Sequence, residues 1–155
     1  MKLSLSVFLL LTFAISAWAE EQWLITPEEA KREAGWEAES PLPKNIRTRV
    51  YIGRNGPDIS LITPTSTADP LISPFPIHIA FKAKEGATIK PESFMALYGF
   101  KKFDITERLT RRAKIEPEGI TIENAAIPAG SHRLILRIID DRGGQSIIEI
   151  RFAVQ

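Results

Sequence analysis

The densest set of side chains that could do chemistry is a group of cations between residues 101 and 114. Six Lys and Arg residues stand there against only two acids, Asp104 and Glu107. Such a group can bind an anionic polymer or an acidic protein surface. The other interpretation is a solvated sheet edge, whose charges discourage strand-to-strand aggregation. The six residues, called the basic cluster below, are Lys101, Lys102, Arg108, Arg111, Arg112 and Lys114.

Aromatic residues precede and interrupt the basic cluster. Tyr98, Phe100 and Phe103 would form a stacking surface for a sugar if their rings were exposed. Tyr98 and Phe100 are two residues apart, so in a strand they share a face. Packing in the core is therefore the simpler expectation for these rings.

Two neighbouring aspartates raise the question of a metal. Asp140 and Asp141 stand beside Gly143 in a predicted loop. Calcium takes six to eight oxygen ligands, commonly from several converging carboxylates. An Asp-x-x-Gly turn, in which the carboxylate accepts backbone amides, uses the same residues without a metal. We predict the turn, with no metal and no cofactor, and keep calcium or another metal as a remote alternative.

Residues for nucleophilic catalysis are not arranged in a recognisable way. The sequence has no cysteine and no Gly-x-Ser-x-Gly motif. His78 falls on the predicted outer face of a strand, and His132 stands at a strand entrance, where an imidazole often caps turn carbonyls. We therefore predict structural roles for both histidines, and no enzymatic activity.

The last quarter of the chain predicts the element around which the fold is built. Two apolar runs flank the loop sequence Asp-Asp-Arg-Gly-Gly-Gln, which is a hairpin signal. The even-numbered positions of both runs are apolar, from Leu134 to Ile138 and from Ile148 to Val154. These positions share the core face, because side chains alternate across a strand. For the register, we predict Arg137 opposite Glu149, which avoids placing Arg133 opposite Arg151.

Short strands separated by Pro and Gly precede this hairpin. The expected strands are 58–63, 77–82, 94–98, 100–105 and 120–123, and residues 106–114 are either one helical turn or a loose edge. With the hairpin this gives about seven strands and almost no helix. The pattern predicts an all-β, antiparallel, immunoglobulin-like sandwich, with a small closed barrel as the rival.

The N-terminal third differs from this pattern. Lys2, an apolar run and Ala17-Trp18-Ala19 predict a signal peptide over residues 1–19 that is cleaved after Ala19. Thr26 and Glu29 predict a capping box for a short helix that Gly35 ends. Residues 20–55 are then a short helix and an extended linker, with a brief strand at 50–52. We expect residues 56–155 to form the domain and to fold without the preceding segment.

Composition limits the classes of partner. The chain of 155 residues has 20 Lys and Arg against 19 Asp and Glu, and cleavage of the signal peptide removes one cation, Lys2. A balanced charge does not predict nucleic-acid binding. Export without disulfides is in keeping with a bacterial periplasm. We expect a periplasmic or secreted protein that has no membrane span after cleavage.

The stretch from Gly56 onward resembles the bacterial immunoglobulin-like and cadherin-like modules of exported proteins. The resemblance rests on Gly56-Pro57-Asp58-Ile59, on residues 86–93, on Ala129-Gly130-Ser131-His132 and on residues 138–144. It implies the sandwich fold and transfers no activity, because such sandwiches host many functions. The two cysteines of disulfide-bonded immunoglobulin domains are missing here.

These observations lead to two functional hypotheses. The first is a non-catalytic module that binds another envelope protein through a sheet face, an edge strand or the N-terminal arm. The second is a module for a glycan or an anionic polymer, bound by the basic cluster.

Overall fold

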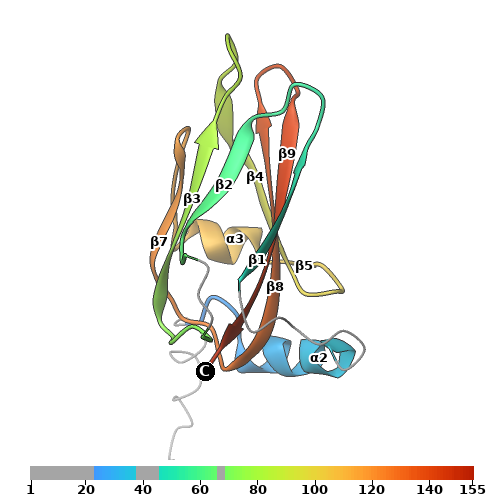
Figure 1. Ribbon diagram of the computed structural model, residues 1–155, viewed down its shortest axis with the longest axis vertical. Helices are drawn as coiled ribbons and strands as arrows, with labels where there is room; N and C mark the ends of the chain where they lie inside the picture. Colours follow the sequence, from blue (N-terminus) through green and yellow to red (C-terminus); the bar gives the residue numbers. More distant parts are fainter. Residues whose placement is uncertain (1–22, 38–45, 66–68) are drawn as a thin grey trace, which may run out of the picture.

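The structure, a computed structural model, describes residues 23–37, 46–65 and 69–155. Within these ranges the chain forms two antiparallel β-sheets that pack face to face, and two short helices (Figure 1). The predicted all-β architecture is confirmed. The predicted signal peptide, residues 1–19, lies outside the described residues.

One sheet has five strands in the order β1-β9-β8-β4-β5. The central strands β8 and β9 form the predicted C-terminal hairpin, with the short β5 at one edge and β1 at the other. Their bounds are Arg47–Ile52 for β1, Gln145–Val154 for β9, Gly130–Asp140 for β8, Ile89–Tyr98 for β4 and Phe103–Asp104 for β5.

The other sheet has four strands in the order β2-β3-β7-β6. Its strands span Asp58–Thr63 for β2, Phe75–Lys82 for β3, Gly119–Ala125 for β7 and Lys114–Glu116 for β6. Helix α2 spans Pro27–Glu37 and lies at the end of the sandwich opposite the turn between β8 and β9 (Figure 1). Helix α3, Thr106–Thr110, connects β5 of one sheet to β6 of the other, so the predicted helical turn is confirmed.

The strand predictions are accurate for β2, whose bounds are as expected. The strand expected at 100–105 is only the two-residue β5, and the one expected at 120–123 is longer, Gly119–Ala125. Two further strands differ where proline lies near a strand end. β3 begins at Phe75 and contains Pro76, and β4 begins at Ile89 and contains Pro91. In both strands the pairing register shifts next to the proline. A proline is tolerated there because it need not donate to the hydrogen-bond ladder.

The predicted register of the C-terminal hairpin is wrong by one pair. Leu136 pairs with Ile148 and Arg137 with Ile147, so Arg133 lies directly opposite Arg151. The predicted pairing avoided this juxtaposition of like charges. The turn explains the outcome, because it is shorter than the expected five-residue loop.

Asp140 and Gly143 hold that short turn. The Asp140 backbone amide donates to the Gly144 carbonyl, and the Gly143 amide donates to the Asp140 carbonyl. The Asp140 carboxylate also accepts hydrogen bonds from the amides of Arg142 (2.9 Å) and Gly144 (2.7 Å). Gly143 has a φ of 79°, which a residue without Cβ adopts easily. The loop therefore has three residues, 141–143, and this length fixes the register.

The core lies between the two sheets and agrees with the predicted alternation. The even-numbered residues of β8 from His132 onward and those of β9 are buried, as are Ile77, Ile79 and Phe81 of β3. A one-residue slip would move all of these side chains to the other face. The predicted core face is thus confirmed, although the pairing within the hairpin is not.

The N-terminal segment also reaches this core. Thr26 and Glu29 form the predicted capping box: each side chain accepts a hydrogen bond from the other residue's amide, at 3.2 and 2.9 Å. Helix α2 continues past Gly35 to Glu37, so the prediction that Gly35 ends the helix is wrong. Leu24 and Ile25, just before the helix, are fully buried in the hydrophobic core.

The expected linker contains a strand of the sheet. The brief strand predicted at 50–52 begins at Arg47 and pairs along its whole length with β9. Both β1 and the Leu24–Ile25 pair therefore belong to the same fold as residues 56–155. That residues 56–155 fold without the preceding segment stays a prediction, and the Discussion gives the experiment that tests it against these contacts.

Candidate functional site

The structure distributes the basic cluster over three elements. Lys101 and Lys102 lie in the turn between β4 and β5, Arg108 lies on α3, and Lys114 is the first residue of β6. Arg111 and Arg112 follow α3 directly. The cluster is contiguous in sequence, and the fold divides it among a turn, a helix with the residues that follow it, and an edge strand.

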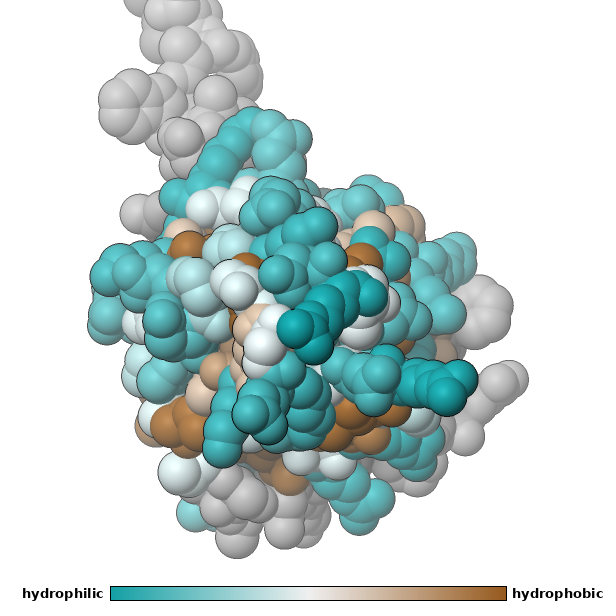
Figure 2. Space-filling view, turned by 90° about the horizontal axis from the view of Figure 1, so that it is seen from above, coloured by the Kyte–Doolittle hydropathy of each residue, from teal (hydrophilic) through white to brown (hydrophobic). Residues whose placement is uncertain are grey.

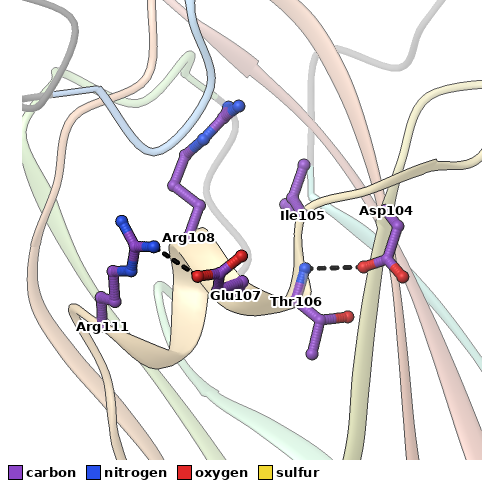
Figure 3. A pocket seen from close by; sticks show the side chains of 6 residues that line it. All are labelled: Asp104, Ile105, Thr106, Glu107, Arg108 and Arg111. Atoms are coloured by element: carbon purple, nitrogen blue, oxygen red, sulfur yellow. Dashed lines mark hydrogen bonds and ion pairs between the residues drawn. The ribbon is translucent and has the colours of Figure 1, made fainter.

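Arg108 has a structural partner. Its guanidinium makes two hydrogen bonds to the Glu29 carboxylate, at 2.6 and 3.0 Å, and a third to the Leu24 carbonyl at 3.3 Å. In Figure 3 its side chain extends away from Glu107 and Arg111. Burial alone raises the pKa of Glu29, but the Arg108 guanidinium and the Thr26 hydrogen bonds outweigh it and hold that pKa below its usual value. Arg108 thus holds the N-terminal segment against the sandwich.

Two cations of the basic cluster line a hollow beside α3. Arg108 and Arg111 line a cavity of about 530 Å³ together with Asp104 and Glu107. Arg111 forms an ion pair with Glu107 one turn earlier (Figure 3), and Lys114 pairs with Glu116 at 2.9 Å. Acids therefore neutralise much of the charge that the sequence places here.

The aromatic residues near the cluster do not form an exposed stacking surface. Tyr98 is fully buried, as expected for core packing, and Phe100 and Phe103 are half-buried. Gly99, with a φ of 76°, separates Tyr98 from Phe100, so the two rings do not share a face. Phe100 instead lies beneath the guanidinium of Arg133, 5.2 Å from its ring centre.

The predicted Asp-x-x-Gly turn is confirmed in the loop that was weighed for calcium. Asp140 binds the amides of its own turn, and Asp141 accepts a hydrogen bond from the Thr88 amide at 2.9 Å. Nearby, Arg54, Lys84 and Arg142 help to line a cavity of about 570 Å³ between the hairpin loops. Figure 2 looks onto this end of the molecule, which is mostly hydrophilic. In the described ranges, no three His, Asp or Glu residues are grouped so that they could hold a metal ion.

His132 is a core residue with two hydrogen-bond partners. Its Nε2 lies 2.8 Å from the Pro128 carbonyl oxygen, and its Nδ1 lies 2.9 Å from the Tyr98 hydroxyl. A carbonyl can only accept, so Nε2 carries the proton and Nδ1 accepts from Tyr98. The predicted capping of a turn carbonyl is confirmed. Burial lowers the pKa of His132 to about 4, although the Pro128 hydrogen bond opposes the shift.

This lowered pKa predicts that acid destabilises the fold before the carboxylates titrate. The unfolded chain takes up a proton on His132 near pH 6.5, whereas the folded chain does so only near pH 4. We expect the free energy of unfolding to fall by about 2 kcal/mol between pH 7 and pH 5. Urea unfolding at pH 7, 6 and 5 measures this change. A His132→Gln variant should lose most of the slope, and an equal slope in the variant would assign it to another group.

A second set of cations, which the sequence analysis did not assemble, lies on the outer face of the five-stranded sheet. Arg47, Arg151 and Arg133 are directly opposite one another on β1, β9 and β8. Two more arginines lie on the same face. Arg49 is two residues along β1 from Arg47, and Arg137 is four residues along β8 from Arg133. We call these five residues the arginine face.

Glu149 is the carboxylate between these arginines. It accepts a hydrogen bond from Arg133 Nη2 at 2.8 Å and one from Arg151 Nε at 2.6 Å, and it is 8% exposed. Burial raises the pKa of Glu149, but the hydrogen bonds and charges of Arg133 and Arg151 outweigh it and lower that pKa below its usual value. Because it binds both guanidinium groups, Glu149 reduces the repulsion that results from placing Arg133 directly opposite Arg151.

The alternation in the sequence contained part of this signal. Arg133 and Arg137 share a strand face with one another, as do Glu149 and Arg151. Arg47 and Arg49 were missing from the pattern because their segment was interpreted as a linker. Once β1 is paired with β9, its two arginines join the other three.

Comparison with known proteins found no matching family model, no matching curated protein and no matching solved structure. Within the part of the chain that the structure describes, no helix is both long and apolar enough to cross a membrane.

Proposed function

We propose that this protein is an exported, non-catalytic interaction module that binds another protein of the cell envelope through the free edge of β1. One observation carries the proposal. All six residues of β1 are exposed, and among the described residues the strand pairs with β9 alone. An unpaired strand edge is a template onto which another chain can add a strand.

Alternate backbone groups of β1 have no strand partner within the described ranges of the chain. The Gly53 amide donates to the Gln145 carbonyl at 2.8 Å, which makes Gly53 and Gln145 a hydrogen-bonded pair. Such pairs alternate along antiparallel strands. The amides and carbonyls of Thr48, Val50 and Ile52 therefore point away from β9, toward the side where an added strand would lie.

Apolar side chains accompany these backbone groups. Val50, Tyr51 and Ile52 are 40%, 49% and 50% exposed, which is unusual for three consecutive large apolar residues in a domain of this size. Val50 pairs with the buried Ile148, so it lies on the core-facing side of the sheet. A strand added to β1 would cover this side chain and extend the apolar layer.

The strand order supports an immunoglobulin-like sandwich. Numbered from β2 with the two-residue β5 left out, the first, second, fifth and fourth strands form the order β2-β3-β7-β6, and the third, sixth and seventh form the order β4-β8-β9 in the facing sheet. Constant-type immunoglobulin domains have these two arrangements. β1 is an additional strand that precedes them, at the edge where we place the binding site.

A proline at position 50 tests this proposal. Val50→Pro removes one outward amide and leaves the hydrogen bonds to β9 in place, because Pro is tolerated where its missing amide faces solvent. With the tagged protein and envelope extract, we expect wild type and Val50→Thr to retain the same partner. Val50→Pro should lose at least nine-tenths of that partner, measured by quantitative mass spectrometry.

The result is judged from two measurements, the stability of each variant and the amount of protein partner that it retains. Urea unfolding should give similar midpoints for the two variants, which shows that the proline acts on binding. Equal recovery of a partner by all three proteins would place the binding site elsewhere. Retention on an envelope polymer, with no protein partner recovered, would favour the glycan or polymer hypothesis instead.

The hypothesis of polymer binding by the basic cluster is the second candidate. Its residues are spread over three elements, and several of them are paired with acids of the same domain. Anion recognition by this protein is better supported at the arginine face, two of whose residues, Arg47 and Arg49, belong to β1.

A further inference from the structure

The arginine face contains a row of like charges that Glu149 neutralises only in part. Arg47, Arg151 and Arg133 lie directly opposite one another across three adjacent strands. Like charges in this position destabilise a sheet. Glu149 has two carboxylate oxygens, and Arg133 and Arg151 occupy one each. No other acid contributes to the arginine face along the described strands that form it.

Several donors of this face have no strong acceptor. Arg49 is fully exposed, and its guanidinium contacts the Tyr51 hydroxyl at 3.2 Å rather than a carboxylate. The Nε atoms of Arg133 and Arg137 are buried and have no hydrogen-bond partner among the residues that the structure describes. A buried donor without a partner costs free energy. The two buried Nε atoms lie away from the edge of the sheet, whereas the exposed guanidinium of Arg49 on β1 is suited to an anionic ligand.

The arginines nearest β1 also form a shallow cavity. It has a volume of about 150 Å³ and is lined by Arg47, Thr48, Arg49, Glu149 and Arg151. Phe100 lies beneath Arg133 and Arg151, with its ring centre 5.2 and 6.0 Å from the two guanidinium carbons. Stacking of this kind holds a guanidinium in place without using its donors.

We propose that the segment that adds to β1 is an acidic strand, with carboxylates at alternate positions facing the arginine face and apolar residues between them. This inference rests on the proposed function of β1. An added strand lies about 5 Å from β1, and its alternate side chains on one face repeat about every 7 Å. The same repeat separates Arg47 from Arg49, so successive carboxylates meet successive guanidinium groups.

The other face of that strand is specified by the same geometry. Its apolar residues lie beside Val50 and Ile52, on the core-facing side of β1. Arginine pairs with carboxylates through two parallel hydrogen bonds, which gives direction as well as attraction. The partner is therefore recognised by its pattern of acidic and apolar residues together with its backbone.

Three synthetic peptides test this inference on the full-length protein. The acidic peptide has eight residues that alternate Val and Glu, the neutral peptide alternates Val and Ser, and the blocked peptide is the acidic one with every backbone amide N-methylated, so that neither of its edges can pair with β1. We expect the acidic peptide to bind at least ten times more tightly than the other two in fluorescence anisotropy at low salt. Raising the salt to 0.5 M should weaken that binding, since exposed charges are screened.

Charge-reversal variants provide the matched control. Arg47→Glu with Arg49→Glu should weaken binding of the acidic peptide at least tenfold. Lys82→Glu with Lys90→Glu changes the net charge equally at two exposed lysines outside the arginine face, and should have little effect. Equal weakening by both double variants would overturn the inference, because net charge alone would then account for the binding.

The outcomes separate this inference from the proposed function. If the neutral peptide binds as tightly as the acidic one and Val50→Pro abolishes both, strand addition stands and the acidic pattern is wrong. If the acidic and blocked peptides bind equally, the arginine face binds anions without strand addition, and this inference fails. If no peptide binds, the inference fails as well, while recovery of the protein partner still decides the proposed function on its own.

Discussion

Replacing Leu136 by Asp is expected to unfold the protein at neutral pH, whereas replacing its neighbour Ile135 by Asp is expected to leave it folded. Leu136 is 2% exposed and lies between the two sheets. An ionised carboxylate there would have no partner, and such burial costs more than most single substitutions, about 5 kcal/mol or more. That is comparable with the whole free energy of unfolding of many domains.

Ile135 provides the matched control, because it is adjacent in the sequence and points to the opposite face. It is half-buried on the outer face of the sheet, with Arg133 and Arg137 as the next residues on its side. A carboxylate there gains two cationic neighbours but stands opposite Glu149, so we expect a loss of about 1–2 kcal/mol. Far-UV circular dichroism and urea unfolding measure both variants. Equal damage from the two would mean that β8 is as intolerant of charge on its outer face as on its inner one.

A chain that begins at Gly56 is expected to be far less stable than the chain that begins at Glu20. It lacks Leu24 and Ile25, which are fully buried and contribute about 1.5–3 kcal/mol each. It also lacks β1, so the edge of β9 is exposed, and Arg108 loses its partner Glu29. We expect a loss of about 5 kcal/mol or more in the free energy of unfolding, measured with urea.

A chain that begins at Ile46 separates the two contributions. It keeps β1 but lacks α2 and the Leu24–Ile25 pair, so its stability should lie between those of the other two chains. A Gly56 chain with the same unfolding midpoint as the longer ones would restore the domain boundary that the sequence predicts at residue 56.

The alternation of apolar residues was enough to predict which faces of the strands are buried. Burial depends on the two-residue period of a strand, and that period can be read from the sequence without knowing which strands pair. Local hydrogen bonds were predictable for the same reason. The capping box of Thr26 and Glu29 and the turn at Asp140 join groups that are only a few residues apart.

Pairing between distant segments could not be predicted in this way. The hairpin register depends on the length of the turn at Asp140, and the cost of placing Arg133 opposite Arg151 falls because Glu149 binds both side chains. The burial of Leu24 and the place of β1 beside β9 depend on contacts across the whole chain. The sequence places the basic cluster in one short stretch, whereas the fold distributes it over a turn, a helix and a strand. The arginine face comes from three separate segments, and only the pairing of β1, β9 and β8 brings their cations onto one surface.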